Sequence, residues 1–195
     1  MPLVGGHGLK RIYLAGPEVF LPDPKGAGQL KCVLAERHGF HGLYPLDATV
    51  DLTGLGKPAQ AQRISASNEQ LMRGADALIA NLTPFRGVSM DSGTAFEVGF
   101  MRALGRPVFG YSNVVPDYKA RAAAFRAHGI PSGDGDRPDI HIEDFDGAEN
   151  LMITAAIEAS GGTVVRTAVA PGTEIEDLRG FEACLLQVKR VITRG

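Results

Sequence analysis

The chain has few cysteines and almost no excess of charge of either sign. Its 195 residues include two cysteines, and its formal net charge at pH 7 is −2. A chain this close to neutral has no basic field for nucleic acid or an anionic membrane, so neither is expected as a partner. Cys32 and Cys184 lie in apolar helical patterns and match no metal-ligand spacing, and the five histidines form none either. We expect buried free thiols, no metal and no cofactor.

Long apolar runs are also missing. None approaches the roughly 18 residues of a membrane span. The first eleven residues, MPLVGGHGLKR, lack the apolar centre of a secretory signal. A reducing, cytoplasmic location is therefore the expected one.

What the chain does contain is an ordinary globular composition, 44% hydrophobic and 22% charged, in which strand and helix patterns alternate. Strands are expected at 11–16, 42–46, 76–82, 107–112 and 163–169. Helices are expected at 28–40, 64–75, 94–105, 117–129, 148–162 and 177–192. A loop is expected at 47–61 and a mobile loop at 130–139. This order predicts a single α/β domain with a parallel, flavodoxin-like or Rossmann-like sheet and helices on both faces. Residues 161–195 are expected to be a strand and helix extension that packs on the same domain.

Apolar stripes predict which helix faces are buried. The residues expected inside are Leu30, Val33, Leu34, Ile64, Leu71, Met72, Phe96, Phe100, Ala103, Phe181, Leu185 and Val188.

The stretch SMDSGTAFEVGFMRALG, residues 89–105, follows a strongly apolar strand and opens a helix. Thr94 and Glu97 fit the S/T-x-x-E capping box, in which Glu97 would only satisfy a backbone N–H. In the other interpretation, the helix dipole keeps a first-turn carboxylate ionised at the ligand-binding edge of the sheet. Such a carboxylate can attack an electron-poor anomeric carbon, and Gly93 would let a substrate approach the backbone. Position alone leaves both interpretations open.

Four segments carry a resemblance: RIYLAGPEVF, ADALIANLTPFRG, DSGTAFEVGFMRALGRPVFGY and AENLMI. In this order, over about residues 11–155, they resemble the nucleoside 2-deoxyribosyltransferase family, which implies such a domain at 1–160. The resemblance implies an enzyme that exchanges the base of a 2′-deoxynucleoside. A glutamate attacks the anomeric carbon, a covalent deoxyribosyl-glutamate forms, and a free nucleobase then attacks it. Retention of configuration follows from the double displacement.

The resemblance implies three catalytic residues. Glu97 would be the nucleophile, and the hydroxyl of Tyr13 would orient it. Asp91 would contact substrate near the sugar and base, and could help to protonate the leaving base. The residues alone also allow Tyr13 to be a half-buried strand residue with a wet hydroxyl, and Asp91 to be an ordinary loop aspartate.

The resemblance also implies residues that bind the base. Gly16, Pro17 and Phe20 would form its floor, although Phe20 could instead belong to the core. Asn68 falls where some members carry an aspartate; an asparagine can orient a base but cannot donate a proton as an acid, or it is simply a solvated helix residue. Asp47 is a weaker pocket candidate, because an aspartate in a turn needs no ligand.

Asn150 matches an asparagine that reaches into the neighbouring subunit's site and holds the sugar 5′-hydroxyl. This implies a homo-oligomer, a dimer or a hexamer, whose sites are completed between chains. Otherwise, Asn150 is a residue that begins a helix.

Two other functions stay open. A related hydrolase of 2′-deoxynucleoside 5′-monophosphates needs phosphate donors, but the loop AGPEVFLPDP is acidic, and Glu18 would repel a phosphate; Arg86 could still reach one. A non-catalytic nucleotide-binding module would tolerate loss of the nucleophile. The preference between purine and pyrimidine bases is not predicted.

Overall fold

A sheet of five parallel strands forms the centre of the protein. The computed structural model describes residues 9–128 and 139–192. Its strands are β1 (Lys10–Ala15), β2 (Phe40–Leu43), β3 (Ala77–Asn81), β4 (Val108–Ser112) and β5 (Val164–Arg166). They lie in the order β2-β1-β3-β4-β5, and every neighbouring pair is parallel. β3 and β4 are buried at every residue, as expected for strands that are covered on both faces.

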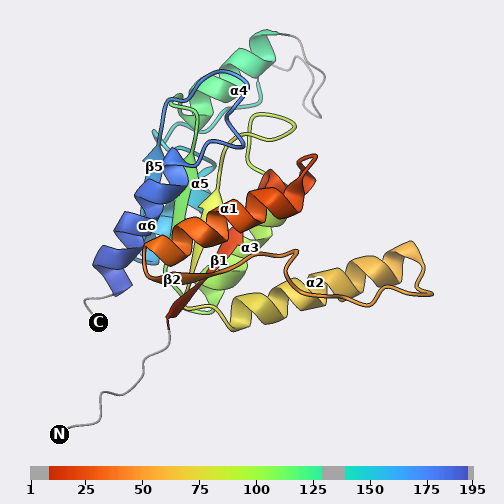
Figure 1. Ribbon diagram of the computed structural model, residues 1–195. Helices are drawn as coiled ribbons and strands as arrows, with labels where there is room; N and C mark the ends of the chain where they lie inside the picture. Colours follow the sequence, from red (N-terminus) through yellow and green to blue (C-terminus); the bar gives the residue numbers. More distant parts are fainter. Residues whose placement is uncertain (1–8, 129–138, 193–195) are drawn as a thin grey trace, which may run out of the picture.

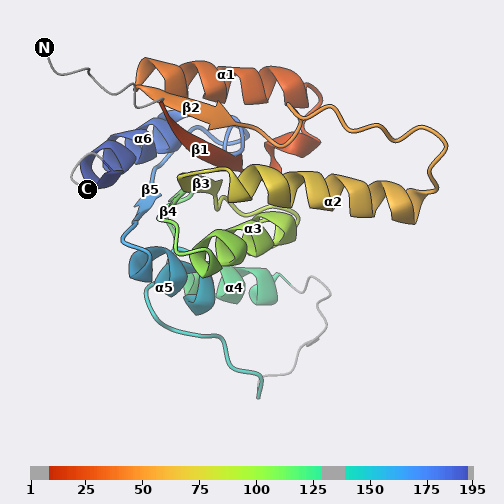
Figure 2. The same ribbon diagram turned by 90° about the horizontal axis from the view of Figure 1, so that it is seen from below.

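Helices cover both faces of this sheet (Figures 1 and 2). On one face lie α1 (Pro24–Arg37) and α6 (Arg179–Ile192), and on the other α3 (Ser92–Ala103) and α5 (Leu151–Ala159). α2 (Lys57–Arg73) packs against α3 at one end and projects from the body at the other. A short 3₁₀ helix, η1 (Pro17–Phe20), follows β1, and α4 (Tyr118–Ala127) follows β4. The predicted fold class is confirmed.

The alternation of side chains along the strands divides the core in two. Ile12 and Leu14 of β1 face α1 and α6, whereas Tyr13 and Ala15 face α3 and α5. This parity puts the Tyr13 side chain on the same side of the sheet as α3.

One of the expected loops, at 47–61, is shorter in the structure. α2 begins at Lys57, so residues 57–61 are helical, because Pro58 provides a helix start in the first turn. The expected mobile loop at 130–139 lies outside the described residues except for Asp139. At the other end of the chain, Phe181, Leu185 and Val188 of α6 are buried as predicted.

The predicted burial of three helix faces is wrong in part. Leu30 on α1 is 62% exposed, and the buried face of that helix carries Lys31 with Gly28 and Ala35 instead. Phe96 on α3 is 56% exposed. Val33 on α1 and Ile64 on α2 are also exposed, because these side chains line pockets rather than the core.

Cys184 is a buried free thiol, as expected, whereas the free thiol of Cys32 is only partly buried. In the described ranges, no helix is both long and apolar enough to cross a membrane.

Candidate active site

The loop between β3 and α3 ends at Asp91, which caps the helix. The Asp91 carboxylate accepts hydrogen bonds from the backbone N–H of Thr94 at 3.0 Å and from its hydroxyl at 3.2 Å. The capping box of Thr94 and Glu97 is therefore wrong, since Asp91 fills the cap position three residues earlier. Thr94 is buried inside the helix, and Glu97 is the sixth helical residue.

Glu97 is bonded to β1 instead. The hydroxyl of Tyr13, a fully buried residue, donates to Glu97 Oε1 at 2.5 Å. The wet hydroxyl considered for Tyr13 is therefore wrong. Burial, and then the neighbouring Glu97 carboxylate, raise the pKa of Tyr13 well above its ordinary value. Tyr13 thus stays protonated and acts as a donor throughout the physiological range.

The protonation of Glu97 reflects opposing effects. Burial raises its pKa from 4.5 to about 7; the Tyr13 hydrogen bond lowers it, and the charge of Asp91 raises it. Burial therefore opposes the ionised form of Glu97 that the helix dipole was expected to favour. Glu97 lies in the second turn, where the dipole is weaker, and desolvation dominates. Near pH 7, both protonation states of Glu97 are populated.

A pocket of about 420 Å³ lies between α2 and α3 beside this carboxylate. Its lining includes Glu97 and Gly93 from α3 and Asn68 from α2. Ile64 and Phe96 form apolar walls of the same pocket, which explains their exposure. Asn68, Gly93 and Glu97 are thus brought together from two helices.

The loop after β1 presents an aromatic surface. Phe20, at the end of η1, is 52% exposed and stacks on Phe85 with ring centroids 5.4 Å apart and an interplanar angle of 12°. The guanidinium of Arg86 lies 4.8 Å from the Phe20 ring centroid and 4.6 Å from that of Phe85. Phe20 is therefore not a core residue. Phe85 was not predicted as a site residue from the sequence. The signal for it is its position in the loop that follows a buried strand.

Glu18 turns away from this surface into the core. Its Oε1 accepts hydrogen bonds from Lys31 Nζ at 2.7 Å, Asn81 Nδ2 at 3.0 Å and the Tyr111 hydroxyl at 2.9 Å. Glu18 and Lys31 are both almost completely buried. The expected repulsion of a phosphate by Glu18 is therefore wrong, because an internal ion pair balances its charge.

Gly16 and Pro17 have structural roles in the same turn. A Cβ on Gly16 would lie 1.9 Å from Glu18 Oε2, so only glycine fits over this carboxylate. Pro17 is buried in the first turn of η1, where its fixed φ suits the helix start. The structure gives both residues a reason to be there without a ligand.

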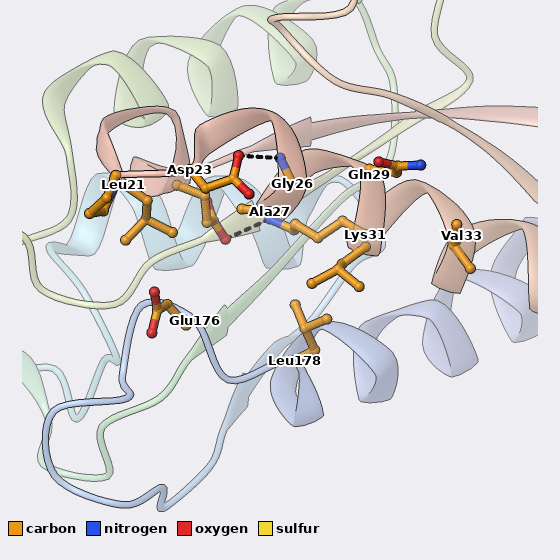
Figure 3. A pocket seen from close by; sticks show the side chains of 12 residues that line it. Leu21, Asp23, Gly26, Ala27, Gln29, Lys31, Val33, Glu176 and Leu178 are labelled. Atoms are coloured by element: carbon orange, nitrogen blue, oxygen red, sulfur yellow. Dashed lines mark hydrogen bonds and ion pairs between the residues drawn. The ribbon is translucent and has the colours of Figure 1, made fainter.

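A second pocket, of about 570 Å³, lies on the other side of the sheet between α1 and the segment before α6 (Figure 3). Leu30 and Val33 of α1 and Leu178 line it, and the Lys31 side chain runs inward beside it to Glu18. It shares no lining residue with the Glu97 pocket.

Asn150 and Asp47 lie outside the lining of the Glu97 pocket. Asn150 caps α5: its Oδ1 accepts from Met152 N at 3.0 Å, and its Nδ2 donates to Glu143 Oε2 at 2.8 Å. Asp47 accepts from Tyr44 N at 3.2 Å in a turn. The turn is reason enough for Asp47 without a ligand, and the cap is at least one role of Asn150.

A sequence model described as nucleoside 2-deoxyribosyltransferase matches residues 12–152. The chain belongs to this family. The match covers β2, β3, β4 and all of β1 but its first two residues, and it includes Tyr13, Asp91, Glu97 and Asn150. Proteins of the family act on deoxynucleosides and nucleobases by pentosyl transfer.

The chain is also similar to individual proteins and solved structures. An uncharacterized protein of Schizosaccharomyces pombe is 29% identical over 180 residues, which cover 84% of each chain. A 2-desoxiribosyltransferase from Leishmania mexicana is 27% identical, with a TM-score of 0.62 over 93% of this chain and 98% of that one. A conserved protein from Enterococcus faecalis V583, 17% identical, has a TM-score of 0.57 over 93% and 98% of the two chains and shows the shared fold.

Proposed function

We propose that this protein exchanges the base of 2′-deoxynucleosides through a covalent deoxyribosyl-Glu97 intermediate. The observation that carries the proposal is the hydrogen bond from Tyr13 to Glu97 beside a pocket that α2 and α3 line. Family membership and the 2-desoxiribosyltransferase from Leishmania mexicana support the same chemistry.

In this proposal, ionised Glu97 attacks C1′ of the sugar with Oε2. The new C1′–O bond forms as the N-glycosidic bond breaks, and the electron pair of that bond leaves with the base. Tyr13 donates to Oε1, which fixes the carboxylate plane. A second base then attacks C1′ from the face that the first one left, its N–H proton passes to the Asp91 carboxylate, and Glu97 is released as the C1′–O bond breaks. Two inversions give net retention.

The leaving base needs a proton. We propose that Asp91, which caps the helix that carries Glu97, supplies this proton after it has itself been protonated, and that the incoming base returns it. Asn68 in the pocket can hold the base by its amide, but it has no acidic proton. Phe20, stacked on Phe85, offers an exposed ring on which a base could stack.

Asn150 is proposed to act in a neighbouring subunit of a homo-oligomer. Its amide lies outside the lining of its own chain's Glu97 pocket, and its partners in the chain are Glu143 and Met152. A two-fold interface would bring the same residue of a second copy to that pocket.

Incubation with deoxyinosine and free adenine, followed by chromatography, tests the proposal. Deoxyadenosine should form, and Glu97→Gln, which preserves the size of the side chain and an acceptor for Tyr13, should form none. Release of free deoxyribose without exchange would indicate a hydrolase. Unchanged substrates would indicate a binding protein and would overturn the proposal.

A second candidate function is hydrolysis of 2′-deoxynucleoside 5′-monophosphates. The placement of Glu18 in the core removes the repulsion that counted against it, and Arg86 is an exposed cation beside Phe20. Incubation with deoxyguanosine 5′-monophosphate and no acceptor base distinguishes it. Release of guanine, lost in Arg86→Gln, would favour this candidate over the transferase.

A further inference from the structure

Glu149 is a buried carboxylate outside the Glu97 pocket that joins two separate segments of the chain. Its Oε1 accepts from Ser89 Oγ at 2.6 Å and from the backbone N–H of Asn150 at 3.0 Å. Its Oε2 accepts from the backbone N–H of Met90 at 3.0 Å and from Arg121 Nη2 at 3.2 Å. The Glu149 side chain is 0% exposed, so these four donors replace water completely.

Arg121, on α4, extends the same network along the β3–α3 loop. Its Nε donates to the carbonyl of Val88 at 2.9 Å, and its Nη1 donates to the carbonyl of Pro116 at 2.8 Å. Residues 88, 89 and 90 are therefore each held by Glu149 or Arg121. The next residue is Asp91.

Glu149 holds residues next to two positions that the proposed function assigns to the substrate. It accepts hydrogen bonds from the backbone N–H of Met90, the residue before Asp91, and from the backbone N–H of Asn150 itself. We propose that Glu149, with Arg121, is a positioning residue that sets Asp91 and Asn150 for binding of the deoxynucleoside. The inference rests on the proposed function, since it assigns substrate contacts to Asp91 and Asn150. Among the residues that the structure describes, neither Glu149 nor Arg121 forms a hydrogen bond or ion pair with Tyr13 or Glu97.

The chemistry requires a carboxylate at this position. All four partners of Glu149 act as donors, two of them backbone N–H groups and one an arginine. In Glu149→Gln, one acceptor oxygen becomes an NH₂ group that faces donors, so at least one backbone N–H loses its partner while the side-chain volume is kept. A buried donor without a partner shifts the backbone that carries it.

The test compares Glu149→Gln with Asp144→Asn. The control removes an exposed ion pair from Lys119 of α4, the helix that also carries Arg121. Steady-state exchange from deoxyinosine to adenine is measured at equal concentrations of folded protein, together with amide hydrogen exchange at residues 88–91 and 150. Glu149→Gln should raise the KM for deoxyinosine at least about tenfold and lower kcat by more than about threefold, because the contacts of Asp91 and Asn150 with the substrate move and Asp91 is also the proposed acid. Amide exchange should accelerate in both segments, and Asp144→Asn should change neither quantity.

A merely structural role would lower the melting temperature and leave the KM of the folded fraction unchanged, and that result would overturn the inference. If Glu149→Gln does not fold, Ser89→Ala removes a single contact and should raise the KM in the same direction; an unchanged KM there would also overturn it. Wild-type protein that exchanges no base would reject the proposed function and the kinetic part of this inference together. In that case, unaltered amide exchange in Glu149→Gln would separately reject the positioning of residues 88–91 and 150 by Glu149.

Discussion

The hydroxyl of Tyr13 and Oε1 of Glu97 lie 2.5 Å apart although the residues are separated by 84 positions in the chain. The contact joins the first strand to the helix that follows the third, across the pairing of β1 with β3. It works against the desolvation that raises the pKa of Glu97 to about 7, while Asp91 acts in the direction of desolvation. The pKa of Glu97 thus depends on two neighbours, Tyr13 and Asp91, with opposite effects.

Tyr13→Phe should move the acidic limb of the pH profile to higher pH. The lost hydrogen bond stabilised the ionised form, so the pKa of Glu97 should rise by about one unit. The measurement is log kcat/KM against pH for deoxyinosine. Tyr44→Phe is the matched control, because the described residues offer its buried hydroxyl no hydrogen-bond partner. An unmoved limb in Tyr13→Phe would show that the contact does not tune Glu97.

Asp91→Asn should move the acidic limb of the pH profile to lower pH. Asparagine still caps α3, but it removes the negative charge that raises the pKa of Glu97. Loss of the proposed acid should also lower kcat by about 10²-fold or more. A limb that shifted upward, or a kcat that was unaffected, would contradict the roles given to Asp91.

Glu97 should make stability depend on pH in a defined direction. Its folded pKa, about 7, is above the value of 4.5 for an unperturbed glutamate. Its contribution to stability is therefore fully present below pH 4.5 and is lost as the pH rises through 7. Glutamine does not titrate. The free energy of unfolding of Glu97→Gln, relative to that of wild type, should therefore rise by on the order of 2 kcal/mol between about pH 5 and about pH 8. Urea unfolding at the two pH values measures this, and a constant difference between the two proteins would refute it.

The sheet was predictable because its strands are short apolar runs separated by turn signals. ALIAN in β3 is buried at every residue, and such a run admits few other interpretations. Local pattern does not fix the start of α3, because both Asp91 and Thr94 are good capping residues. Only the tertiary contact with Tyr13, which removes Glu97 from the cap, decides between them.

The charged core could not be predicted from local pattern. Leu30, Val33 and Leu34 form a plausible apolar face, yet α1 is rotated so that Lys31 faces the sheet. The rotation is possible because Glu18, from a different turn, neutralises the ammonium. Glu149 escaped prediction for the same reason, since its four donors come from distant segments.

Lys31→Met should be strongly destabilising. It leaves the buried Glu18 carboxylate without its cation, which costs about 3–5 kcal/mol of unfolding free energy. Adding Glu18→Gln removes the unpaired charge and should recover most of that loss. Urea unfolding of the two variants measures the difference. A single variant as stable as wild type, or a double variant no better than the single one, would show that the pair does not hold the core together.

Asn150→Ala and Glu97→Ala should each be defective alone and complement each other when mixed. If Asn150 serves a neighbouring subunit, a mixed dimer has one site with an intact Glu97 and an intact Asn150 from the other chain. Random exchange of subunits gives about half mixed dimers, so roughly a quarter of wild-type sites should recover. Asn150→Ser gives the matched comparison, because serine still caps α5 but is too short to reach across an interface. It should be as inactive as Asn150→Ala and more stable. Verified subunit exchange without any gain in activity would show that Asn150 does not act between chains.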